Sequence, residues 1–62
     1  MSNLVVRLTE AFMRLSKGEL SEEEARLKAE EVAPNYDFTK YPMLRHKGLN
    51  WYARQILESM KG

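Results

Sequence analysis

The sequence predicts an all-α fold, a compact bundle of three to four short helices formed by one small domain over residues 1–62. Apolar residues recur at helical spacing in the first and last parts of the chain. Capping, proline and glycine signals divide the chain into segments of helix length. No strand pattern competes with these signals, because Leu4, Val5 and Val6 form too short a run and continue a helical pattern.

The first helix is predicted to begin at a cap formed by Ser2 or Asn3 and to run to about Lys17, with Gly18 as its stop. Six apolar residues fall on one broad face at 100° per residue. They are Leu4, Val5, Leu8, Ala11, Phe12 and Leu15. Val6 and Met13 share a second, narrower face. They are either single exposed apolar residues, which are ordinary, or a contact with a second copy or another partner.

Ser21 and Glu24 have the spacing of a capping box, which predicts a second helix starting at Glu22. The acidic residues of its first turn also suit the positive end of the helix dipole, so they need no catalytic or metal-binding role. Pro34 is expected to end this helix at about Ala33. Its inner face is built from small residues, namely Ala25, Ala29, Val32 and Ala33, and Leu27 points the other way.

The C-terminal part is predicted to contain a short helix over residues 42–47, capped by Thr39 or Tyr41, with Pro42 in its first turn. A turn over residues 38–41 capped by Asp37 is the alternative. Gly48 either stops this helix, with Asn50 capping a new one, or lies inside one continuous helix. The break is preferred because stop and start signals occur together. The last helix, from Trp51 to about Lys61, places five residues on one face: Tyr52, Ala53, Ile56, Leu57 and Met60.

Composition excludes several kinds of site. The chain has no cysteine and one histidine, His46, so disulfides, thiolate metal sites and histidine clusters are excluded and no cofactor is expected. No apolar run approaches the roughly 18 residues of a membrane span, and the N-terminus lacks the pattern of a signal peptide. A soluble, cytoplasmic protein is therefore expected.

No enzymatic function is predicted. The serines lie at helix ends or outer faces without a base, nothing in the sequence places His46 beside Asp37, and the isolated glycines form no phosphate-binding loop. No catalytic residue is assigned.

Residues 35–52 hold five of the six aromatic residues, interleaved with basic ones. Residues 1–33 carry a net charge of −2 (five basic against seven acidic groups) and residues 34–62 carry +3 (five against two). These features favour a non-enzymatic protein–protein interaction module, a regulator, inhibitor or assembly subunit. The predicted partner-binding residues are Tyr41, Arg45, His46, Trp51 and Arg54.

Two questions stay open at this point. Trp51 lies off the apolar face of the last helix, so it is either covered by neighbouring residues or an anchor for a partner. The alternative function is nucleic-acid binding by residues 40–54, whose basic groups and aromatic rings suit phosphates and bases. Self-association is also left open.

Overall fold

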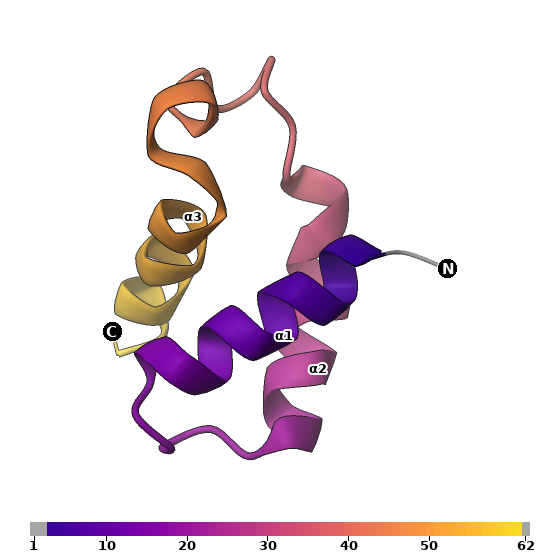
Figure 1. Cartoon of the computed structure of the whole chain (residues 1–62), viewed down its shortest axis with the longest axis vertical. Helices are drawn as coiled ribbons and strands as arrows, with labels where there is room; N and C mark the ends of the chain where they lie inside the picture. The colour runs from indigo at the N-terminus through magenta and orange to yellow at the C-terminus, as the bar shows by residue number, and fades with distance from the viewer. Residues whose placement is uncertain (1–2, 62) are drawn as a thin grey trace.

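The computed structural model describes residues 3–61, which form three α-helices and one 3₁₀ turn. The helices are α1 (Asn3–Leu15), α2 (Glu22–Val32) and α3 (Leu44–Met60), with the turn η1 (Ala33–Asn35) after α2. Helix α1 packs against both other helices (Figure 1). The all-α prediction is confirmed, and residues 3–61 contain no strand. None of the helices described is long and apolar enough to cross a membrane.

Helix α1 ends two residues earlier than predicted, through backbone hydrogen bonds of the Schellman type. The amide of Gly18 donates to the carbonyl of Met13 (3.4 Å), and the amide of Lys17 donates to that of Arg14 (3.2 Å). Lys17 therefore takes the left-handed position that glycine usually fills, with φ 57°. At the other end, Asn3 is already helical rather than a cap, and Ser2 lies outside the described residues.

Helix α2 begins at the predicted capping box. The amide of Glu24 donates to Ser21 Oγ (3.2 Å), and the amide of Ser21 donates to Glu24 Oε1 (2.9 Å). The α-helix ends at Val32, and the chain tightens into η1, which contains Pro34. The predicted end near Ala33 is thus correct to one residue.

Helix α3 is broken at Gly48, as preferred from the sequence. Gly48 has φ 80° and ψ −170°, and it is the one residue within Leu44–Met60 whose backbone is not helical. Figure 1 shows the resulting offset between a short first segment and a longer second one. The prediction that Asn50 caps the second segment is wrong, because Leu49 and Asn50 are already helical. Neither Thr39 nor Tyr41 caps the first segment, which begins at Leu44 without a side-chain cap.

The core lies where the three helices meet. Its buried residues are Leu8, Ala11 and Phe12 from α1, Ala25, Ala29 and Val32 from α2, and Leu44, Tyr52 and Ala53 from α3. All six residues of the predicted α1 face are buried or packed against this core. Ala25 and Ala29 have no exposed surface, which shows that small side chains let α1 and α2 approach closely. The predicted face of the last helix is right except for Met60, which is 44% exposed near the chain end.

Candidate interaction surface

The five predicted partner-binding residues fall on both sides of the break in α3 at Gly48. Tyr41, Arg45 and His46 are exposed and lie in the segment that leads into α3 or in its first turn. Trp51 and Arg54 follow the break at Gly48, so they do not continue the helical register of Arg45 and His46. The predicted set therefore divides at the kink.

Trp51 contributes to the packing of the core. Its side chain is partly buried and packs against the hydrophobic core. Of the two alternatives left by the sequence, the structure supports coverage by neighbouring residues over a free, exposed anchor.

Arg54 lines a different hollow, between the α1–α2 connection and the C-terminal end of α3. This groove has a volume of about 470 Å³, and its apolar lining residues include Leu15, Leu20 and Leu57. Lys17, Arg54 and Lys61 line it together with Glu19 and Glu58, so charges of both signs are present. The mixed charge gives this groove no clear preference for a ligand.

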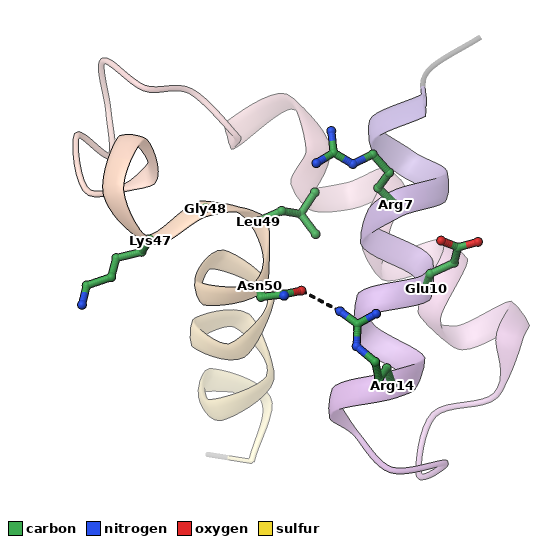
Figure 2. Close-up of a pocket in the computed structure, with 7 residues that line it drawn as sticks. All are labelled: Arg7, Glu10, Arg14, Lys47, Gly48, Leu49 and Asn50. Carbon is green, nitrogen blue, oxygen red and sulfur yellow. Dashed lines mark hydrogen bonds between the residues drawn. The ribbon is translucent and has the colours of Figure 1, made fainter.

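Asn50 has a structural contact in place of its predicted capping role. Its Oδ1 accepts a hydrogen bond from Arg14 Nη2 at 2.7 Å, which ties α1 to the start of the second segment of α3 (Figure 2). Arg7 and Lys47 also line the shallow cleft at this point, but Figure 2 shows Lys47 extending away from the two arginines. The cations of this cleft do not converge on a common point, so the geometry describes a clamp between helices and no anion site.

The segment before α3 is an ordered series of turns. Asp37 Oδ1 accepts hydrogen bonds from the amide of Thr39 (2.8 Å) and from its hydroxyl (2.7 Å). The carbonyl of Asp37 also accepts from the amides of Lys40 (3.1 Å) and Tyr41 (2.9 Å). Asp37 therefore organises the turn over residues 38–41, the arrangement weighed as the alternative from the sequence. The hydrogen bonds from Thr39, followed by the charge of Lys40, lower the pKa of Asp37 below its ordinary value.

Aromatic rings attach this segment to the core through Tyr52. The Tyr52 hydroxyl is buried and donates to the carbonyl of Val32 at 2.8 Å. The rings of Tyr36 and Tyr41 meet the Tyr52 ring edge-on, with centroids at 5.2 and 5.7 Å, and Phe38 meets Tyr36 in the same way at 6.0 Å. Such edge-to-face pairs add roughly 0.5–1.5 kcal/mol each beyond simple burial. The turns are thereby fixed on the folded helices.

Three large apolar side chains nevertheless stay exposed on this ordered segment. Phe38 is 46% exposed, Tyr41 40% and Met43 46%. Sequence reasoning named Tyr41 but missed Phe38 and Met43. The signal available for them was their position beside turn residues, Asp37 and Pro42, where a helical face cannot bury them.

The same segment also carries exposed basic side chains. Lys40, Arg45, His46 and Lys47 are all exposed, and Asp37 is the one acidic residue between positions 36 and 47. The segment has a net charge of +2 with His46 neutral, from three cations and one acid. Within residues 3–61 the single ion pair is Lys28 with Glu31, so none of these cations is paired.

We call this set the aromatic-basic surface. It consists of Phe38, Lys40, Tyr41, Met43, Arg45, His46 and Lys47. Figure 1 shows the chain arching over one end of the molecule here, between η1 and the first segment of α3. Three of the five predicted residues, Tyr41, Arg45 and His46, belong to it, and Trp51 and Arg54 do not.

The aromatic-basic surface contains no groups arranged for metal binding. Within the described part of the chain, no three histidine, cysteine or acidic residues lie together in a way that suits a metal ion.

Comparison of the chain with protein-family models, curated proteins and solved structures finds no match. Function is therefore inferred from the geometry of the surface itself.

Proposed function

We propose that this chain is a non-enzymatic protein–protein interaction module, a regulator, inhibitor or assembly subunit, that binds its partner through the aromatic-basic surface. One observation carries the proposal. Phe38, Tyr41 and Met43 are 40–46% exposed on a segment that hydrogen bonds and ring contacts hold in place. Part of each of these side chains is buried against the fold, and the exposed part is available to a partner. Aromatic, methionine and arginine residues are enriched at interfaces.

The same geometry favours a preformed binding surface. A loop that is already fixed loses less conformational entropy on binding than a disordered one. The absence of cysteine is consistent with a reducing, cytoplasmic setting for this function.

Site-specific photo-crosslinking tests the proposal. A benzophenone amino acid at position 38 replaces one exposed aromatic ring with another. The same group at Leu27, which is 57% exposed on the outer face of α2, serves as the matched control. In cells that make the chain, position 38 should crosslink to a discrete protein that position 27 does not reach. Equal products from both positions, or none from position 38, would contradict the proposal.

Nucleic-acid binding is the second candidate, because two half-exposed rings, Phe38 and Tyr41, lie among unpaired cations. Replacement of Lys40, Arg45 and Lys47 by alanine should then abolish salt-sensitive binding to single-stranded DNA or RNA. Unchanged affinity, or no binding by the wild type, would exclude it. Two features favour protein over nucleic acid. A net charge of +2 is small for phosphate binding, and Met43 offers an apolar contact that suits a protein side chain.

A further inference from the structure

We propose that the ligand of the aromatic-basic surface is a short acidic segment of the partner protein, with apolar side chains among its carboxylates. This inference rests on the protein-interaction function proposed above and narrows it to one class of ligand.

Charge gives the first argument. Lys40, Arg45 and Lys47 have no acidic partner within the described residues. Asp37 forms an ion pair with none of them, and its Oδ1 accepts two hydrogen bonds from Thr39, although the charge of Lys40 also acts on this carboxylate. An incoming carboxylate would complement this positive field, and complementary charges select partners and speed their encounter.

The placement of the apolar side chains gives the second argument. Phe38, Tyr41 and Met43 lie within a few residues of Lys40 and Arg45 in the sequence, so exposed apolar and cationic side chains occur on the same short segment. A ligand that matches this pattern has apolar and acidic side chains interleaved. A purely acidic ligand would leave the apolar side chains in water, and a purely apolar one would bury unpaired cations.

The size of the surface gives the third argument. A large aromatic residue buries about 150–250 Å² in total, so three half-exposed side chains offer on the order of 300 Å². A stable interface between globular proteins takes about 800 Å² from each partner, of which a little over half is apolar. The apolar part therefore fits a short segment better than a broad protein face.

A second copy of this chain is a poor occupant for the same surface. In a two-fold symmetric dimer the same patch meets itself. The net positive patch of one copy would then face the net positive patch of the other, and opposed like charges disfavour such a contact.

Selection from a displayed library of random peptides tests the ligand class. The folded 62-residue chain is immobilised, and bound peptides are recovered. Peptides enriched in aspartate or glutamate together with aromatic or aliphatic residues are expected. Their affinity should fall on the order of tenfold when NaCl is raised from about 50 to about 500 mM, because salt screens exposed charge pairs.

Two variants of equal charge change serve as a matched pair. Arg45→Glu, on the aromatic-basic surface, should weaken the binding of the selected peptides by about tenfold or more, which is equivalent to losing one charged contact. Arg26 lies on α2, away from the aromatic-basic surface. Arg26→Glu should therefore change the affinity for the peptides less than about twofold, the size of a screened long-range effect.

The outcomes separate the two proposals. Neutral or basic peptides whose binding is lost in Phe38→Ser or Met43→Ser would overturn the acidic ligand and leave the interaction function standing. Equal losses in Arg45→Glu and Arg26→Glu would also overturn it, since the effect would then be one of net charge alone. Failure to select any peptide that depends on Phe38, Met43 or Arg45, together with no specific crosslink at position 38, would overturn both.

Discussion

Tyr52 joins the exposed aromatic segment to the core. Its hydroxyl satisfies the Val32 carbonyl, and its ring receives Tyr36 on one side and Tyr41 on the other. Tyr52→Phe keeps the ring and removes the hydrogen bond. We expect a loss of about 1 kcal/mol in the free energy of unfolding, because the buried carbonyl loses its donor. Urea denaturation at pH 7 measures this, and an unchanged midpoint would show that the hydrogen bond adds nothing.

Tyr52 also makes the stability of the fold depend on pH in the alkaline range. Burial, followed by the charge of nearby Tyr41, raises the pKa of Tyr52 above its ordinary value of 10.0. The folded state thus holds the phenolic proton more tightly than the unfolded state. This contribution is fully present below pH 10 and is lost as the pH rises through 10 and above. Between pH 9 and about 11, wild type should lose more stability than Tyr52→Phe. Equal losses of stability in wild type and Tyr52→Phe would contradict this role of Tyr52.

Lys17 is strained where α1 ends. Left-handed backbone geometry costs a non-glycine residue roughly 1–2 kcal/mol. Glycine avoids this cost, but part of the gain is offset because glycine loses more conformational entropy on folding. Lys17→Gly should therefore stabilise the protein by roughly 0.5–1 kcal/mol. Arg26→Gly, inside α2, is the control and should destabilise it by about 1 kcal/mol. Thermal denaturation distinguishes them, and a loss of stability in Lys17→Gly would contradict the assigned geometry.

At the scale of the helix, Gly48 decides how the C-terminal half is arranged. Its backbone lies in a region that is essentially restricted to glycine. A Cβ atom there would meet nothing within 4 Å, so the cost of Gly48→Ala is in the backbone and not in crowding. We expect a loss of about 1–3 kcal/mol. Replacement by D-alanine, whose chirality favours positive φ, should cost less. Equal losses for the two alanines would contradict this explanation.

The helices could be predicted because their signals are local. The apolar face of α1, the Ser21–Glu24 capping box and the stop at Pro34 all act within a few residues. The role of Asn50 could not be predicted, because its hydrogen bond to Arg14 joins residues 36 positions apart. The end of α1 was missed by two residues because Lys17 adopts a geometry that sequence favours for Gly18.

The candidate surface could be predicted only in part, for a reason that concerns the whole molecule. The sequence located the aromatic and basic segment, but which side chains are buried depends on the kink and on the packing of Tyr52. Trp51 packs against the core, whereas Phe38 and Met43 remain exposed. A helical projection that ran through Gly48 would have grouped Leu44, Gly48 and Trp51 on one stripe, which the break disrupts.

The whole molecule thus divides its aromatic residues between folding and exposure. Tyr52 and Trp51 pack on the core, and Phe38 and Tyr41 are held at one end with about half of their surface free. This division predicts unequal losses of stability for two truncations. Trp51→Ala should lower stability by about 2 kcal/mol, part of the cost of truncating a fully buried aromatic residue. Phe38→Ala should lower it by about 1 kcal/mol or less, because about half of its ring is already in water.

The most direct measurement of the central claim compares Phe38→Ala and Trp51→Ala in two assays, urea denaturation and affinity for a peptide selected on the wild type. We expect Phe38→Ala to lose binding by about tenfold or more while it stays folded. Trp51→Ala should bind within about twofold of wild type under conditions where it remains folded, in spite of its lower stability. The account would be contradicted if Phe38→Ala were unfolded or bound the peptide as well as wild type does, and if Trp51→Ala lost binding without losing stability.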